Sequence, residues 1–510
     1  MFDQETPTPW YQSTGLLIAA CILLPPVGLV LLWLNRKPPI HTPIRKIIGS
    51  LALVLLGIWY VFLFNSWQRS RGNDAHYTAL EQHRQQQASA PAPTAAPVAA
   101  TSPVPQASAS PSPGETPAAP APATGRNYWT NFRGPRRDGK YDESSVSTNW
   151  PSNGLPVVWK QPVGLGHSSF AVADGKAFTI EQRRNQEVVA AYDLNNGREL
   201  WTQKWNAEFA DSTGDGPRAT PTWDQGRIYA LGATGELRCL DANTGSVVWG
   251  KNILSDNQAS NLSWGVASSP LVVDDKVIVL PGGTAGKSVV AYNKMTGAPV
   301  WKVLNDKQAY VSPMLVELGG RRQIVVVSSS RVVGLVPEDG SLLWSYPWDT
   351  NGGINVSQPI VVDRNRLFIS SGYGKGAALI ELKPAGDKFT ASMIWENINM
   401  KNKFNSSVLH NGHIYGLDEG ILTCLDVNNG ERKWKDGRYG YGQVLLAAGH
   451  LIITTEKGEL ALVKASPSGF TEVARFAALQ GQTWNYPAIA NGRLLVRNSS
   501  EMAAYDISGR

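Results

Sequence analysis

The segment Asp193-Leu-Asn-Asn-Gly-Arg-Glu-Leu-Trp201 contains the pattern that decides the fold of this chain. An aspartate opens a turn, a glycine closes it, and a tryptophan follows four residues after the glycine. With the same separation of glycine and tryptophan, the pattern returns as Asp241–Gly245–Trp249, Asn293–Gly297–Trp301, Gly340–Trp344 and Asp426–Gly430–Trp434. A local pattern that recurs in this way is the sequence signature of a repeat architecture.

Apolar strand pairs around a polar turn precede these endings, for example at residues 222–230 and 271–279. Trp395 ends a sixth unit with a longer turn, and Phe476 takes the place of tryptophan in a seventh. Successive end positions lie 39 to 52 residues apart. That interval is typical of four-stranded propeller blades and too long for the common helical repeats, so the pattern predicts an all-β propeller.

An eighth unit begins at residues 491–496 and 502–506, but the chain ends at Arg510 before the expected tryptophan. Trp159 has no blade before it, so its segment is expected to complete the last blade. An open ring would leave a long unpaired sheet edge, and closure removes that edge. The sequence therefore predicts eight blades over residues 127–510.

Two apolar stretches near the N-terminus predict transmembrane helices at residues 15–34 and 47–67. The loop at 35–46 between them carries four basic residues, whereas residues 1–14 carry only two acidic ones. The positive-inside rule places that loop in the cytoplasm and both flanking segments outside. We therefore expect a two-pass protein of the inner (cytoplasmic) membrane with a short extracytoplasmic N-terminus and a periplasmic propeller.

Cys21 offers an alternative, because Ile18-Ala19-Ala20-Cys21 resembles a lipobox. No positive charge precedes it, however, and the apolar run continues past it. The same missing charge disfavours a cleaved signal peptide. We therefore interpret Cys21 as a small apolar residue within a membrane helix.

Residues 68–126 are predicted to be a juxtamembrane segment and a disordered Pro/Ala-rich linker. The stretch 88–123 holds 10 prolines, and Glu115 is its one charged residue. Such a composition buries too little apolar surface to offset conformational entropy. The linker is therefore expected to act as a tether between membrane and propeller.

Charge and cysteine content exclude two classes of protein. The chain has 47 Lys and Arg against 41 Asp and Glu, and residues 1–87 hold 7 and 4 of these. The remainder is nearly neutral and has no basic stripe, which excludes a nucleic-acid binder. With 3 cysteines in the chain, a disulfide-built scaffold is excluded as well.

The repeated Asp-x-x-x-Gly-x-x-x-Trp endings resemble the PQQ-like (quinoprotein-type) β-propeller repeat family over about residues 127–510. Further segments of that style lie at 129–135, 164–169, 214–222 and 264–270. The resemblance implies the propeller fold. Members of the family include PQQ-dependent alcohol dehydrogenases and the propeller subunit of the outer-membrane barrel assembly machinery, a non-catalytic scaffold.

The dehydrogenase branch implies features that can be checked: a disulfide between adjacent cysteines, an acid-rich calcium site with a catalytic aspartate, and haem attachment in some members. No two cysteines are adjacent here, and we find no matching acidic cluster or Cys-x-x-Cys-His motif. Cys239 and Cys424 occupy equivalent places four blades apart, so we predict free, buried thiols. PQQ with calcium remains the alternative cofactor, and we assign no catalytic residue and no metal ligand.

The blade-opening strands begin with small polar residues, and these should line the central channel of a propeller. One interpretation is a narrow, hydrated channel whose Ser and Asn side chains satisfy the strand ends. The other makes one mouth of the hub a ligand site. Candidate residues for that mouth are His167, Ser168, Asp215, Arg218, Trp264, Ser268, Ser312, Asn355, Asn405 and Asn485.

Two local expectations accompany these candidates. Arg218 in the glycine-containing loop 211–218 would clamp an anion, or, as we favour, would form a salt bridge with Asp215 that fixes the loop. His167 lacks a second ligand at metal spacing. The repeated tryptophans are predicted to pack between neighbouring blades: Trp159, Trp201, Trp249, Trp301, Trp344, Trp395 and Trp434.

The sequence thus predicts a membrane-anchored extracytoplasmic propeller that works as a binding or scaffold module in the cell envelope. Its partner would be an envelope protein or a small ligand at the propeller face, with no nucleic acid. The alternative is a PQQ-dependent oxidoreductase that uses the hub.

Overall fold

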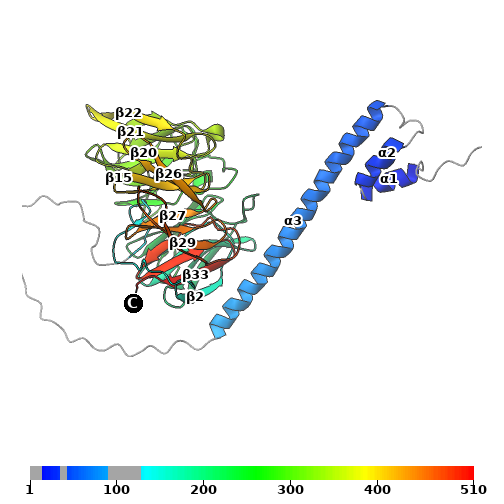
Figure 1. Cartoon of the computed structure of the whole chain (residues 1–510), viewed down its shortest axis with the longest axis horizontal. Coiled ribbons are helices and arrows are strands. Elements are labelled where there is room, and N and C mark those ends of the chain that lie inside the picture. The colour runs from blue at the N-terminus through cyan, green and yellow to red at the C-terminus, as the bar shows by residue number, and fades with distance from the viewer. Residues whose placement is uncertain (1–13, 24, 35–42, 90–127, 510) are drawn as a thin grey trace, which may run out of the picture. The chain divides into compact units, whose positions relative to one another are not determined.

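A computed structural model of the chain describes residues 14–23, 25–34, 43–89 and 128–509, and forms two compact units, Met1–Thr78 and Ala79–Arg510. The first unit contains three helices (Figure 1): α1 (Thr14–Leu23), α2 (Pro25–Leu34) and the first part of α3 (Pro43–Ser89). Leu31 and Leu32 of α2 pack on Leu53 of α3. Trp33 Nε1 also donates a hydrogen bond to Ser50 Oγ at 2.9 Å.

The structure has two ten-residue helices where the sequence predicts one helix over 15–34. Proline lacks an amide hydrogen and clashes with the preceding turn, so Pro25 and Pro26 begin a new helix. Each short helix spans about 15 Å, roughly half of a hydrocarbon core of about 30 Å. Among the described helices, the segment Ile47–Ser89 of α3 is long and apolar enough to cross a membrane, by length and composition.

α3 continues well beyond residue 67, where the sequence predicts its end. Residues 1–13, 35–42 and 90–127 lie outside the described residues. They hold the predicted extracytoplasmic N-terminus, most of the predicted cytoplasmic loop and most of the predicted linker, so these remain predictions.

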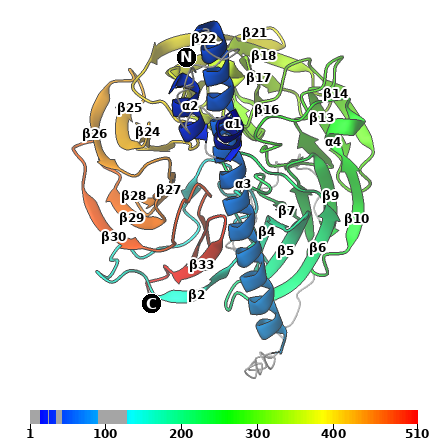
Figure 2. The ribbon, with the colours of Figure 1, turned by 90° about the vertical axis from the view of Figure 1, so that its right-hand side faces the viewer.

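The second unit contains eight antiparallel blades around a hub (Figure 2). Blades 1 to 4 consist of β3 (Ala171–Ala173), β4 (Lys176–Arg183), β5 (Gln186–Asp193) and β6 (Glu199–Asn206); β7 (Thr222–Asp224), β8 (Arg227–Leu231), β9 (Glu236–Asp241) and β10 (Val247–Asn252); β11 (Leu271–Val273), β12 (Lys276–Val279), β13 (Val289–Asn293) and β14 (Pro299–Val303); β15 (Met314–Leu318), β16 (Arg321–Val327), β17 (Arg331–Leu335) and β18 (Leu342–Pro347). A short helix α4 (Ile253–Asp256) follows blade 2.

Blades 5 to 8 complete the ring. They consist of β19 (Ile360–Val361), β20 (Arg366–Ser371), β21 (Gly376–Ala385) and β22 (Lys388–Asn397); β23 (Val408–His410), β24 (His413–Asp418), β25 (Ile421–Asp426) and β26 (Arg432–Arg438); β27 (Gln443–Ala447), β28 (His450–Thr454), β29 (Glu459–Lys464) and β30 (Glu472–Ala477); β31 (Ala488–Ala490), β32 (Arg493–Arg497), β33 (Glu501–Asp506) and β2 (Val157–Pro162). The predicted eight-bladed, four-stranded propeller is confirmed.

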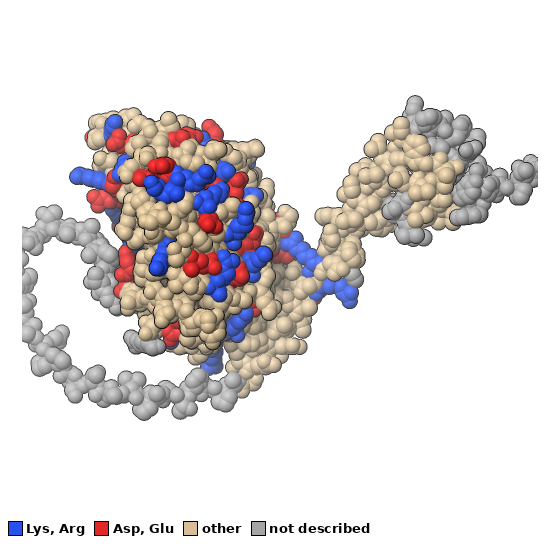
Figure 3. Space-filling model, viewed as in Figure 1, with Lys and Arg blue, Asp and Glu red and all other residues tan. Residues whose placement is uncertain are grey.

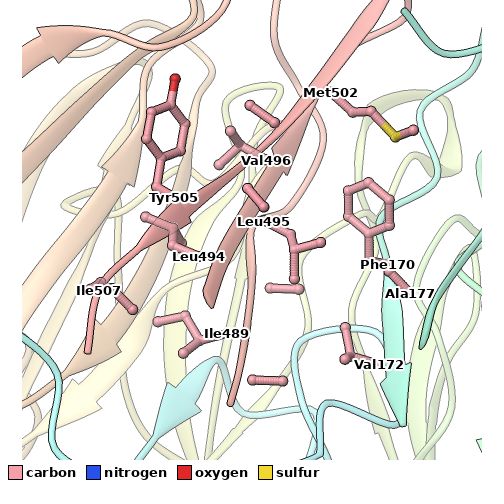
Figure 4. Packing of buried hydrophobic residues seen from close by; sticks show 14 of the residues in the cluster. Phe170, Val172, Ala177, Ile489, Leu494, Leu495, Val496, Met502, Tyr505 and Ile507 are labelled. Carbon is pink, nitrogen blue, oxygen red and sulfur yellow. The ribbon is translucent and has the colours of Figure 1, made fainter. Parts of the chain in front are cut away.

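The ring closes as the sequence predicts. Strand β2 pairs antiparallel with β33, and Trp159 stands opposite Ala504. Figure 4 shows the core near this closure, where Phe170 and Val172 of the first blade face Leu495 and Met502 of the last. Strands from both ends of the propeller therefore share one sheet and one core.

The repeated tryptophans contact the next blade, and the repeated glycines leave room for this contact. Trp201 Nε1 donates to Ala242 O in blade 2 at 3.2 Å. A Cβ on Gly245, in the same turn of blade 2, would lie 2.5 Å from the Trp201 ring. The same pairing of a tryptophan with a glycine of the following blade recurs at Trp159–Gly197, Trp249–Gly297, Trp301–Gly340 and Trp395–Gly430.

Trp344 departs from this scheme. Its Nε1 donates to Gln323 Oε1 within blade 4 at 2.5 Å. Blade 5 has the long β21–β22 hairpin at the place where other blades have the glycine turn. Trp434 follows the general rule and donates to Ser466 O of blade 7 at 2.9 Å.

A buried carboxyl joins blades 1 and 2. Glu187 accepts a hydrogen bond from Trp205 Nε1 at 2.9 Å and from the Ala233 amide of blade 2 at 2.7 Å. Burial raises the pKa of Glu187 to about 7, although both hydrogen bonds oppose the shift. Because the folded protein binds this proton more tightly than the unfolded chain, the proton's contribution to stability is full below about pH 4.5 and is lost as pH rises through about 7.

We expect Glu187→Gln to flatten the pH dependence of stability between pH 5 and 8. Between pH 5 and pH 8, deprotonation of Glu187 should lower the free energy of unfolding of the natural protein by up to about 3 kcal/mol. The decrease should be smaller in the variant. Thermal unfolding of the full chain at both pH values measures the difference. Exposed Glu208 provides the control: if Glu208→Gln flattened the profile as much as Glu187→Gln, the assignment to Glu187 would be wrong.

Candidate functional site

Polar side chains form a ring of hydrogen bonds around the hub, from blade to blade. The amide of Ser169 donates to Thr220 Oγ1 at 3.0 Å, and the amide of Thr220 donates to Ser269 Oγ at 2.9 Å. The series continues through Ser312, Gln358 and Ser406. Gln443 of blade 7 bridges the carbonyl groups of Phe404 and Trp484, and Ser169 Oγ donates to Tyr486 O. We call these residues the hub ring.

A segment that precedes the propeller strands crosses the hub. Trp129 forms a bridge with Val172 of blade 1, and β1 (Lys140–Tyr141) pairs in parallel with β27 of blade 7. Residues 131–139 between these two anchors lie inside the ring of blades, and we call them the hub plug. The hydrated channel expected from the sequence is therefore crossed by a peptide segment.

Two buried arginines hold the plug in place. Arg137 is 2% exposed and donates to Ser269 O at 3.1 Å and to Pro313 O at 2.9 Å, so it joins blades 3 and 4. Arg133 is 1% exposed, donates to Ser407 O at 2.7 Å and lies 4.8 Å from the centre of the Tyr486 ring. Burial lowers the pKa of Arg137 to about 9.

The backbone at both arginines is left-handed, with φ values of 62° and 57°. A non-glycine residue adopts this conformation at a cost, and the surrounding contacts have to hold it there. The hydrogen bonds to the blades are those contacts. The plug contributes to the lining of several cavities in the hub, among them one lined by Phe132 and one lined by Arg136 and Arg137.

The cavity at the starts of the innermost strands has a volume of about 150 Å³. Aromatic rings dominate its lining. A continuous series of ring contacts runs from Tyr310 to Trp264 (5.1 Å between centroids), to Phe404 (6.0 Å), to Trp484 (5.0 Å) and to His167 (5.7 Å). Phe132 of the plug and Tyr486 of blade 8 also line the cavity and contact each other at 5.7 Å. We call this space the aromatic hub pocket.

The polar side of the pocket is formed by the loop 211–218. Arg218 pairs with Asp211 at 2.6 Å and donates to Gly214 O at 2.7 Å, while its guanidinium carbon lies 4.5 Å from the centre of the Phe209 ring. The bridge from Arg218 to Asp211 is one that the sequence did not predict. The loop itself uses the donors of Arg218, which argues against the anion clamp.

His167 lines the pocket with its ring, while both of its nitrogens are shielded and have no hydrogen-bond partner of ordinary geometry among the described residues. Burial, together with the positive charges of Arg218 and Arg497, lowers the pKa of His167 to about 3. The ring is therefore neutral across the physiological pH range.

A second cavity, of about 370 Å³, lies farther along the innermost strands, beyond the plug. Its lining includes Arg136 and Lys140 of the plug side and Val272, Met314 and Glu317 of the blades. The plug lines this cavity as well as the aromatic hub pocket. The lining of this cavity contains no aromatic residue. The two cavities therefore offer chemically different surfaces.

Of the ten residues proposed from the sequence for the hub mouth, four line the aromatic hub pocket: His167, Arg218, Trp264 and Ser312. The other six are buried nearby and do not line it: Ser168, Asp215, Ser268, Asn355, Asn405 and Asn485. Sequence reasoning missed the rings of Phe132, Tyr310, Phe404 and Trp484. A usable signal was present for the last three, because each aromatic residue stands within a few positions of a polar blade start.

The pocket does not fit PQQ with calcium. Calcium prefers carboxylate and carbonyl oxygen ligands, and the lining of this pocket contains no carboxylate. Across the described part of the chain, no three His, Cys, Asp or Glu side chains gather in a way that would hold a metal ion. A tricyclic quinone also exceeds a cavity whose volume suits about one benzene ring. Cys239 and Cys424 are buried and unpaired, as predicted.

Comparison with known proteins agrees with this architecture. A family model described as outer membrane protein assembly factor BamB matches residues 184–436. Over the matched residues the chain is similar to the PQQ-like β-propeller repeat family. The resemblance inferred from the repeated Gly-x-x-x-Trp endings is confirmed.

Two branches of PQQ-like propellers appear among the relatives. BamB of Shewanella oneidensis is 24% identical over 302 residues, which cover 55% of this chain and 70% of that protein. A quinoprotein ethanol dehydrogenase of Pseudomonas aeruginosa is 28% identical over 218 residues, but these cover 36% of this chain and 34% of the enzyme. The match to the enzyme is therefore confined to a third of its length.

The solved structure of quinohemoprotein alcohol dehydrogenase ADHIIG from Pseudomonas putida HK5 superimposes with a TM-score of 0.56. Its sequence is 13% identical, and the match covers 75% of this chain and 81% of that one. At this identity the likeness concerns the fold alone. The chemistry of the site has to be argued from the pocket.

Proposed function

We propose that this PQQ-like propeller is a membrane-anchored scaffold that binds a protein partner in the cell envelope through the mouth of its hub. The observation that carries the proposal is the aromatic hub pocket, a cavity that the plug closes on one side and that lacks an acid–base or metal constellation in its described lining. The relatives named outer membrane protein assembly factor support a scaffold role.

The chemistry of the pocket favours recognition of a protein. Tyrosine and tryptophan contribute large apolar area and dominate binding hot spots in protein interfaces. On the face drawn in Figure 3, acidic and basic residues of the propeller are intermingled, without a patch of one sign. A nucleic-acid backbone would require a basic patch, which this face does not show. From the aromatic lining of the pocket we infer a protein partner.

Membrane anchoring belongs to the same proposal. The apolar segment that begins at Ile47 of α3 supplies one span, and the uncharged helices α1 and α2 supply a second apolar segment. A break at Pro25 is tolerated inside a bilayer where neighbouring helices satisfy the freed backbone groups. Basic residues between the two segments favour a cytoplasmic loop, which puts the propeller on the periplasmic side.

Site-specific photo-cross-linking in cells tests this function. A benzoylphenylalanine at exposed Ser212, next to the pocket-lining Thr213, should give one discrete adduct with an exported protein. The same probe at exposed Glu317, in the cavity beyond the plug, serves as the matched control and should give no such adduct. Equal adducts from both positions, no adduct at all, or a cytoplasmic partner would contradict the proposal.

A further inference from the structure

The size of the aromatic hub pocket limits what can enter it. Its volume of about 150 Å³ equals that of an apolar protein cavity known to hold one benzene molecule. The pocket is large enough for one six-membered ring with a short stem. It is too small for a fused three-ring system or for a folded peptide segment.

The walls of the pocket provide ring faces and ring edges at aromatic contact distance. Trp264 and Tyr310 are tilted by 38° at 5.1 Å, and Trp264 meets Phe404 edge-on at 79° and 6.0 Å. Offset and edge-to-face pairs at 4.5 to 7 Å contribute about 0.5 to 1.5 kcal/mol beyond the burial of area. A further ring would extend a network that already has this geometry.

The charged groups near the pocket disfavour a cationic occupant. Arg218 lines the pocket, and Lys403 Nζ lies 5.4 Å from the Phe404 ring and 4.8 Å from the Tyr441 ring. These aromatic faces therefore already hold a cation, and no carboxylate of the lining would balance a second one. A lysine or arginine side chain is disfavoured by repulsion.

We propose that the aromatic hub pocket receives a single neutral six-membered ring, namely one phenylalanine or tyrosine side chain of the protein partner. This inference rests on the proposed function, because the ring belongs to the partner of the scaffold. The plug forms the floor against which the ring packs, through Phe132. The pocket thereby binds one aromatic anchor residue of the partner, and the loops around the mouth contact the partner residues on either side of it.

Binding of capped amino acids to the purified full chain tests the inference. N-acetyl-phenylalanine amide should bind with a stoichiometry of one in isothermal titration calorimetry. N-acetyl-leucine amide should bind at least about fivefold more weakly, since it lacks the ring contacts, and N-acetyl-lysine amide should not bind. Lysine amide that binds as tightly as phenylalanine amide would overturn the inference.

A pair of matched variants locates the binding. Ala267→Trp fills the aromatic hub pocket from its lining, and Val272→Trp adds the same side chain to the cavity beyond the plug. Phenylalanine amide should lose its binding to the first variant and keep its affinity for the second. Thermal unfolding shows whether both variants are folded. Unchanged affinity of a folded Ala267→Trp variant would overturn the proposed site.

Two further results separate this inference from the proposed function. Benzyl alcohol that binds in the pocket while the capped aromatic amides do not would overturn the side-chain occupant in favour of a free small molecule. The Ser212 adduct should also disappear in the Ala267→Trp variant. If that adduct persisted while amide binding was lost, the scaffold function would stand and the aromatic anchor would be wrong.

Discussion

Replacing Trp301 by alanine should lower the free energy of unfolding of the propeller by about 3 to 5 kcal/mol. The ring is 9% exposed, and its Nε1 donates to Pro337 O across the blade boundary at 3.2 Å. Removing it leaves a cavity between blades 3 and 4 and an unpaired carbonyl group. Denaturant unfolding of the full chain, followed by intrinsic fluorescence, measures the loss.

Two neighbouring variants test the reason for this loss. Trp301→Phe keeps a ring and removes the hydrogen bond, so it should cost clearly less than the alanine variant. Gly340→Ala should also destabilise the protein, because Gly340 has a φ of 76° and its new Cβ would lie 2.8 Å from the Trp301 ring. A loss below about 1 kcal/mol for Trp301→Ala would contradict the role of the repeated tryptophans as blade contacts.

Replacing Arg137 by alanine should lower the free energy of unfolding by about 3 kcal/mol. The guanidinium group donates to carbonyl groups of blades 3 and 4, and its removal leaves these acceptors buried without partners. The left-handed backbone at residue 137 would then lose the contacts that hold it. Thermal and denaturant unfolding of the full chain measure the effect.

The adjacent Arg136 supplies the control. Its side chain is 50% exposed and makes surface ion pairs with Asp138 and Asp142. Such pairs contribute about 0 to 1 kcal/mol, so Arg136→Ala should change stability little. Equal losses for the two variants would mean that Arg137 does not hold the plug.

The fold could be predicted from the sequence because each blade repeats one local solution. The glycine of one turn leaves room for the tryptophan of the preceding blade, as Gly297 does for Trp249, so both residues recur from blade to blade. Ring closure could be predicted as well, since Trp159 stands without a blade of its own. Both features appear as a repeat, or as an incomplete unit of that repeat, and a single sequence is enough to show them.

The plug could not be predicted, because it occurs once and has no period. Arg133, Arg136 and Arg137 look alike in the sequence, yet two are buried in the hub and one is exposed. Whether an arginine here is buried depends on carbonyl groups of blades that lie more than a hundred residues away in the sequence. The break between α1 and α2 falls at Pro25 and Pro26, whereas the sequence predicts one helix over residues 15–34.

The pocket was predicted in part for a similar reason. Trp264 and His167 stand in segments that resemble known propeller sequences, whereas Phe404 and Trp484 stand alone beside polar blade starts. Their mutual contact at 5.0 Å arises only when the ring closes. The spacing of the sequence pattern locates the mouth of the hub. Closure of the propeller determines which aromatic side chains lie together there.

Native-state hydrogen exchange of the plug tests most directly whether the hub is a one-ended pocket. The amide of Gly139 donates to Arg133 O at 3.0 Å, and the amide of Val172 in blade 1 donates to Trp129 O at 2.8 Å. If the plug is part of the folded hub, both amides should exchange only through global unfolding, at similar protection. Exchange at Gly139 that is orders of magnitude faster than at inner-strand amides, with the blades still protected, would contradict a closed hub.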